Sequence, residues 1–172
     1  MVKGIGYGLI VFSCCALGEQ AAGRLKIHRK GLKQLKSWLS YFRGKVLFEG
    51  ATVEEALRES AGLSGAPFSL FFCRVADALN RREGELFSDI WEREGEQCRK
   101  QFSFSEEEYA DFLRFGSHLG QMDREVQQRA VAVYDERLTT AIRSAEEEIA
   151  VKEKLYRSLG LMAGCLIIIL IW

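Results

Sequence analysis

The chain has 172 residues, with 24 basic and 24 acidic side chains and therefore a formal net charge of zero. Hydrophobic residues make up 48% and charged residues 28%, which excludes intrinsic disorder and suits one globular domain of ordinary size. The balanced charge gives no sign of a nucleic-acid-binding protein, and a single proline, Pro67, favours long helices.

The chain begins with an apolar segment. Residues 4–18 carry no charge, but these 15 residues are fewer than the roughly 20 that a membrane-spanning helix needs. We therefore extend the segment and assign residues 1–23 to an N-terminal transmembrane segment. A cleaved signal peptide is the alternative, because Lys3 precedes the apolar run, and a lipoprotein signal ending at Cys14 would have a poorly fitting Phe12.

A basic stretch follows the apolar segment. Between Arg24 and Lys45 there are eight basic residues and no acid, which argues against cleavage because such a stretch is translocated unfavourably. From Val46 to Ala150, by contrast, 22 acids stand against 12 bases, a net charge of −10. The basic stretch beside an apolar segment indicates contact with membrane lipid headgroups.

Residues 24–157 form the predicted central domain, and every pattern in it is helical. Apolar residues at steps of three and four predict a helix over residues 25–48, with Leu32, Leu35, Leu39, Phe42 and Val46 inward. A second helix is expected to begin at Thr52, in a capping box with Glu55, and to bury Val53, Ala56, Leu57 and Ala61.

The next two helices are expected on either side of a break near Gly84. Residues 68–79 form the third helix, with Leu70, Phe71, Val75, Ala78 and Leu79 inward. Residues 85–100 form the fourth, with Leu86, Ile90 and Trp91 inward.

Two further helices complete the predicted domain. Ser105 and Glu108 fit a second capping box, and the inward face of the following helix is Tyr109, Phe112, Leu113, Gly116 and Leu119. From Asp123 no turn signal appears before Gly160, which predicts one helix of roughly 50 residues and about 75 Å. Its inward positions are Val126, Ala130, Tyr134, Leu138, Ala141, Ala145 and Ile149. The sequence thus predicts an all-α bundle of about six helices with a long C-terminal helix.

The chain ends in a second apolar segment. Residues 159–172 are uncharged and follow Lys152, Lys154 and Arg157, so we assign residues 158–172 to a C-terminal transmembrane segment. A buried core helix is the alternative. Because basic residues lie on the central side of both apolar segments, the central domain is predicted to be cytosolic and both termini to lie across the membrane.

The sequence contains no motif for nucleotide, metal or nucleophilic chemistry. Cys73 and Cys98 lack a CxxC partner, and His28 and His118 are the only histidines, so no metal and no cofactor is expected. The acidic triplets at residues 106–108 and 146–148 point around a helix rather than toward one ion. Cys73 with His118 could suggest a nucleophile, but no orienting residue is spaced to support it, and we do not expect an enzyme.

The most unusual stretch is residues 115–127, where Gly116 and Gly120 stand four apart near a helix end. The glycines allow close backbone approach or a sharp corner, and Asp123 fits the N-cap of the long helix. The stretch is interpreted either as a tight helix–helix corner or as a partner-contact site, and both can hold. The predicted contact residues are Gly116, Leu119, Gly120, Asp123 and Gln127.

The sequence resembles the stage III sporulation protein AB family. The resemblance rests on LRFGSHLGQMDREVQQ at residues 113–128, on KLYRSLGLMAGCLIIIL at residues 154–170, and on a basic start and capping step further upstream. The pattern G-x-x-L-G-x-x-D-x-x-x-Q falls on the five contact residues just named. Val53 departs from the family, which usually has proline after the cap residue of this helix.

This resemblance implies a role in endospore formation, in the membrane complex that joins mother cell and forespore. It implies a location on the mother-cell side of the outer forespore membrane. It also implies partners among the other subunits of the complex, including its cytosolic ATPase. Family members resemble the helical domains of the inner-membrane platform proteins of type II secretion and type IV pilus systems, which implies a non-catalytic platform. A homo-oligomer and a generic two-anchor tether that acts through its long helix remain open.

Overall fold

The computed structural model describes the backbone of residues 23, 25–81, 84–121 and 123–171, and side chains as far as residues 152 and 155. The chain divides into two compact units. One is Lys30–Ile142, and the other takes the remaining described residues at both ends. The predicted N-terminal transmembrane segment lies outside the described residues, as do the side chains of the predicted C-terminal one.

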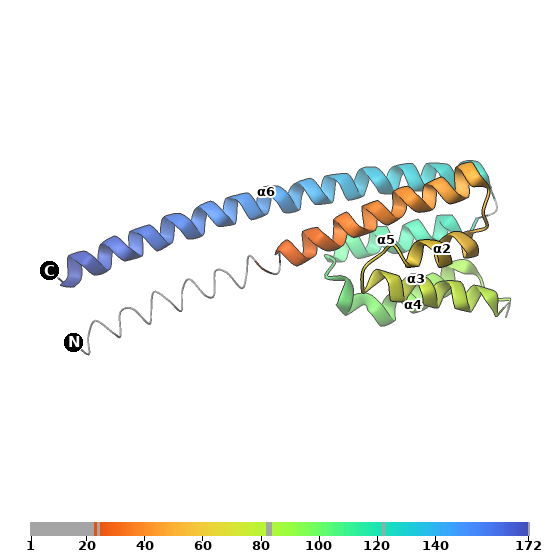
Figure 1. Cartoon of the computed structure of the whole chain (residues 1–172), viewed down its shortest axis with the longest axis horizontal. Coiled ribbons are helices and arrows are strands. Elements are labelled where there is room, and N and C mark those ends of the chain that lie inside the picture. Colours follow the sequence, from red (N-terminus) through yellow and green to blue (C-terminus); the bar gives the residue numbers. More distant parts are fainter. Residues whose placement is uncertain (1–22, 24, 82–83, 122, 172) are drawn as a thin grey trace. The chain divides into compact units, whose positions relative to one another are not determined.

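Every element in the described ranges is a helix, which confirms the predicted all-α class (Figure 1). Residues 25–43 are α-helical and continue into a π-helical turn, η1 (Gly44–Glu49). Four helices follow: α2 (Val53–Ala61), α3 (Phe68–Asn80), α4 (Phe87–Phe102) and α5 (Glu106–Leu119). The last, α6 (Arg124–Ile171), runs for 48 residues, which confirms the long C-terminal helix.

Of the two predicted capping boxes, the one at Ser105 forms completely and the one at Thr52 forms in part. The Thr52 hydroxyl accepts a hydrogen bond from the Glu55 amide at the start of α2. At α5 the complete reciprocal box is present, since Ser105 accepts from the Glu108 amide and the Glu108 carboxylate accepts from the Ser105 amide at 2.7 Å. These side chains satisfy backbone donors that the first helical turn leaves unpaired, and so fix where each helix begins.

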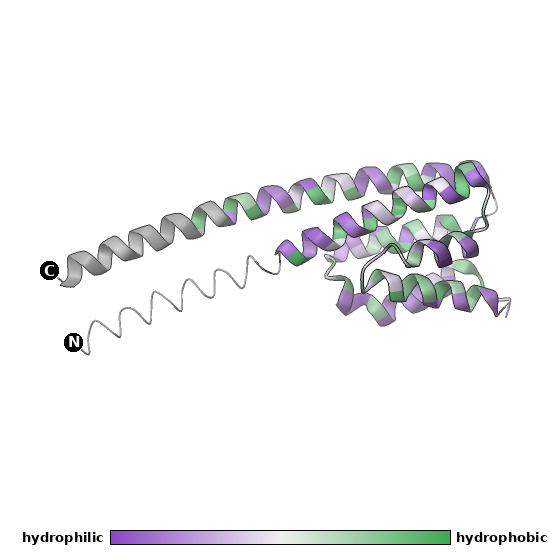
Figure 2. Cartoon of the chain, viewed as in Figure 1, coloured by the Kyte–Doolittle hydropathy of each residue, from purple (hydrophilic) through white to green (hydrophobic). Residues whose placement is uncertain are grey.

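The core of the Lys30–Ile142 unit is largely aromatic. Trp38 stacks on Phe72 with ring centroids 3.9 Å apart, and its indole Nε1 donates to the hydroxyl of buried Ser60 at 2.7 Å. Each buried aromatic ring removes a large apolar area from water, and its packing fixes the helices against one another. Hydrophobic and hydrophilic residues alternate along these helices as expected for amphipathic elements (Figure 2). The largest fully buried side chains are Trp38, Trp91, Phe42, Phe68, Phe71, Phe72 and Phe112.

Two inward assignments were wrong. Leu70 is 44% exposed, because the buried face of α3 is centred on Phe68, Phe71, Phe72, Val75 and Ala76. Leu86 is 67% exposed, because α4 begins at Phe87 and Leu86 is its N-cap, with an extended backbone outside the helical period. The five positions predicted inward in residues 25–48 are all buried, as expected.

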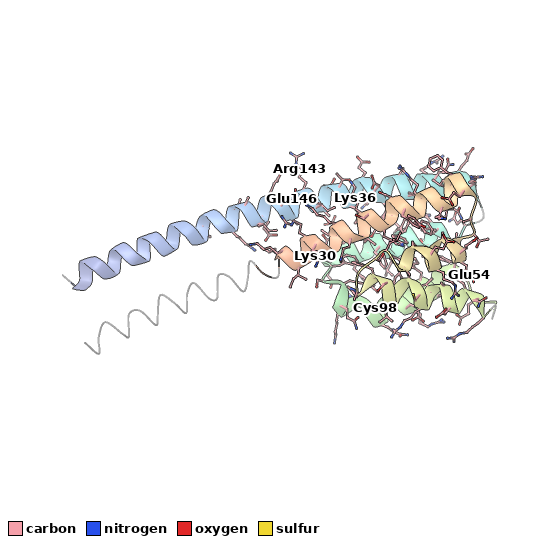
Figure 3. The ribbon with its side chains drawn as sticks, viewed as in Figure 1. Lys30, Lys36, Glu54, Cys98, Arg143 and Glu146 are labelled. Carbon is pink, nitrogen blue, oxygen red and sulfur yellow. The ribbon has the colours of Figure 1, made fainter. Side chains whose placement is uncertain are left out.

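Part of the basic stretch is used within the domain. Lys36 donates to the Thr139 hydroxyl on α6 (Figure 3), and Lys45 pairs with Glu49 at 2.8 Å and with Glu59 at 2.9 Å. The two carboxylates raise the pKa of Lys45 above its usual value. Within the residues that the structure describes, no helix combines the length and the apolarity required to cross a membrane.

Candidate interaction site

The predicted corner between α5 and α6 is built around two glycines that face α4. A Cβ atom added at Gly116 would lie 2.2 Å from Cδ1 of Trp91, and one added at Gly120 would lie 2.7 Å from Cβ of Phe87. Gly120 has a right-handed backbone, with φ of −72°, so a left-handed conformation is not its reason. Close approach of α4 and α5 explains both glycines.

The polar residues of the corner fasten the start of α6. The Gln127 side-chain amide donates to the carbonyl of Leu119 at 3.0 Å and to that of Gln121 at 2.8 Å. The Asp123 carboxylate accepts from the Glu125 amide at 2.9 Å, as predicted for an N-cap residue. The Gln127 side chain is half-buried and joins the two helices.

The five predicted contact residues differ in their exposure to solvent. Gly116 and Leu119 are buried, Gln127 is half-buried, and Gly120 and Asp123 are exposed. The structure therefore gives Gly116, Leu119 and Gln127 roles within the fold. The contact of this corner with a partner remains a prediction, and Asp123 is its most accessible side chain.

Beside the corner lies a groove of about 300 Å³ between α5 and α6, which is not predicted from the sequence. The lining residues recur at steps of three and four, so each helix offers one face. α5 contributes Asp111, Arg114, Phe115 and His118. α6 contributes Val126, Arg129, Ala130, Val133, Tyr134 and Arg137.

The two helices run antiparallel along this groove. Residues near the end of α5 contact residues near the start of α6, and residues further back in α5 contact residues further along α6, as expected for two helices joined by a short corner. The paired residues are Leu119 with Gln127, Phe115 with Tyr134, and Asp111 with Arg137. The Phe115 and Tyr134 rings stack with centroids 4.5 Å apart and form the apolar floor.

One carboxylate serves two of the three arginines in the groove. Asp111, with its side chain 14% exposed, accepts from Arg137 Nη1 at 2.6 Å and 2.7 Å and from Arg114 Nη1 at 3.2 Å. The hydrogen bond to Asp111 raises the pKa of Arg137. Burial, with a smaller contribution from Asp111 and Glu108, raises the pKa of the Tyr134 phenol well above its usual value, so Tyr134 is neutral at physiological pH.

Cys73 and His118, the pair considered for nucleophilic catalysis, lie on different helices. Cys73 is exposed on α3, Cys98 is buried on α4 (Figure 3), and His118 lines the α5–α6 groove. Burial raises the pKa of the Cys98 thiol, which disfavours its nucleophilic thiolate form. In the part of the chain that the structure describes, no group of histidine, cysteine and acidic side chains is placed to hold a metal ion.

Comparison with known proteins gives concordant matches. The model of a family described as stage III sporulation protein AB matches residues 3–172. A curated protein of Bacillus subtilis (strain 168), named stage III sporulation protein AB, is 26% identical over 171 residues, or 99% of each chain. A solved structure named stage III sporulation protein AB (SpoIIIAB) superposes with a TM-score of 0.64 at 22% identity, over 70% of this chain and 94% of that one, and supports the fold.

Proposed function

Because the chain belongs to the stage III sporulation protein AB family, we propose that it is a non-catalytic platform subunit of the membrane complex between mother cell and forespore. In this role its helical domain docks the cytosolic ATPase of the complex and holds it beside the other subunits. The family match along residues 3–172 is the observation that carries the proposal.

The architecture of the Lys30–Ile142 unit suits a docking platform. Its helices are fixed by aromatic packing and by hydrogen bonds such as that from Trp91 Nε1 to the Phe112 carbonyl at 3.1 Å. A packed core of this kind holds surface side chains in one arrangement, and a preorganised surface binds a partner at a lower entropic cost. The corner with Asp123 and the adjoining α5–α6 groove are the surfaces we propose for contact.

We further propose that residues 1–23 and 158–172 are membrane anchors and that the domain between them is cytosolic, on the mother-cell side of the outer forespore membrane. The basic residues on the central side of each apolar segment support this orientation. Protease added to spheroplasts that produce the full chain should leave the region from Glu106 to Glu148 intact. Cleavage there before permeabilisation would refute the topology.

A two-anchor tether is the second candidate, and the 48 residues of α6 favour it. Purification of the tagged full chain from solubilised membranes of sporulating cells separates the two functions. A platform brings the ATPase with it at a constant ratio. A tether brings membrane subunits without the ATPase, and that result would overturn the platform function.

A further inference from the structure

The α5–α6 groove has the chemistry of a binding site for one particular kind of helix. We infer that it binds a single amphipathic helix of a neighbouring subunit, in which carboxylates flank an apolar stripe. This inference deepens the proposed platform function and rests on it. The shape of the groove, its charge and its apolar walls all favour such a helix.

The shape of the groove fits a helix. Two antiparallel helices present lining residues at steps of three and four, which is the spacing at which a third helix packs its own side chains. The α6 wall from Val126 to Arg137 extends over about 16 Å, or about three helical turns. Phe115 and Tyr134 close the floor, while Val133 is 48% exposed and offers apolar surface at the rim.

The charge of the groove selects an acidic occupant. Arg114 and Arg137 share one carboxylate, that of Asp111. Within the described ranges, no carboxylate lies within ion-pair distance of the Arg129 guanidinium. The groove is therefore cationic on a domain whose residues 46–150 carry 22 acids and 12 bases, a net of −10. Arginines at the edge of an apolar surface are frequent anchors in protein interfaces.

A second copy of this chain is a poorer occupant. Its own acidic stretch with exposed apolar residues, around Glu148, Val151 and Leu155, is a weaker match, because the Glu148 carboxylate is already paired with Lys152 at 2.6 Å. An anionic lipid headgroup fits less well too, because the two arginines that converge on one point, Arg114 and Arg137, are already bound there to the Asp111 carboxylate.

The test uses the full chain in sporulating cells, with the photo-crosslinking residue benzoylphenylalanine at position 133 in place of valine. The crosslinked peptide is sequenced by mass spectrometry. We expect one segment of another subunit, with apolar residues at steps of three and four and carboxylates beside them. An adduct to this chain itself, an adduct to lipid, an adduct to a segment of other chemistry, or no adduct would each overturn the inference.

Charge reversal gives the matched control. Arg129→Glu should lower the adduct yield about tenfold or more, because it opposes the carboxylates of the occupant. Arg143→Glu makes the same change on an exposed α6 arginine outside the groove (Figure 3) and should leave the yield unchanged. Replacing the acidic residues of the crosslinked segment with lysine should restore the adduct yield of the Arg129→Glu variant. Equal adduct yields in the two variants, or no restored adduct with the lysine-substituted segment, would overturn the inference. If the ATPase still co-purifies with the chain in that case, the platform function stands without the inference.

Discussion

The Trp91 indole lies so close over Gly116 that a Cβ atom there would come within 2.2 Å of the ring. Trp91 is itself held in place, because it is fully buried and donates to the Phe112 carbonyl at 3.1 Å. Even one methyl group at Gly116 must therefore displace a large, fixed side chain. The contact explains why α4 and α5 can pack closely beside the corner.

Gly116→Ala is accordingly expected to destabilise the domain by about 1–3 kcal/mol through overpacking. Chemical unfolding of the full chain in detergent, followed by helical circular dichroism, measures the change. Gly44→Ala is the control, because a Cβ at Gly44 meets nothing within 4 Å. Equal stability of the two variants would contradict the packing described for Trp91.

Gln127→Ala removes both hydrogen bonds that join α6 to the end of α5. We expect the free energy of unfolding to fall by about 1–3 kcal/mol, since each of the two bonds contributes about 0.5–1.5 kcal/mol. The neighbouring Gln128 is exposed, and Gln128→Ala should change the free energy of unfolding by less than about 0.5 kcal/mol. The idea that Gln127 fastens the corner fails if both variants unfold alike.

Asp123→Asn separates the cap from a partner contact. Asparagine also caps helices well, so the free energy of unfolding should stay within about 0.5 kcal/mol of the parent. If the exposed Asp123 carboxylate contacts a partner, the variant should nevertheless retain less ATPase in co-purification and lower the spore yield. Parent-like binding and sporulation would show that Asp123 only caps α6.

The raised pKa of the buried Tyr134 phenol leads us to expect that the domain loses stability at alkaline pH. Its folded-state pKa lies above the usual 10.0, so above about pH 10 the unfolded chain releases the phenolic proton first and stability falls as the pH rises. Unfolding between pH 7 and pH 11 should show a smaller decline for Tyr134→Phe than for the parent. An unchanged decline would mean that the burial of this phenol does not govern the alkaline response.

Local signals in the sequence predicted much of this fold. Ser105 with Glu108 gave the start of α5, and Asp123 gave the start of α6, because caps are satisfied by neighbours in the chain. The inward face of residues 25–48 followed from a regular period. Leu86 was misassigned because its helix begins one residue later, and an apolar residue at an N-cap looks periodic in the sequence.

The groove could not be predicted, because it depends on which helix faces which. Arg129 and Arg137 recur at helical spacing beside Ala130 and Val133, and this pattern of bases among apolar residues was the available signal. The pairings of Phe115 with Tyr134 and of Asp111 with Arg137, which the structure alone provides, show that these faces meet those of α5. The contact between Gly116 and Trp91 could not be predicted either, since Trp91 lies on another helix, 25 positions away in the sequence.

The central claim is that this chain docks the ATPase of the sporulation complex, and direct binding tests it most simply. The full chain is embedded in lipid nanodiscs, and binding of the purified ATPase is measured against empty nanodiscs. The account predicts saturable binding at a fixed ratio of ATPase to chain. Binding no greater than that to empty nanodiscs would contradict it.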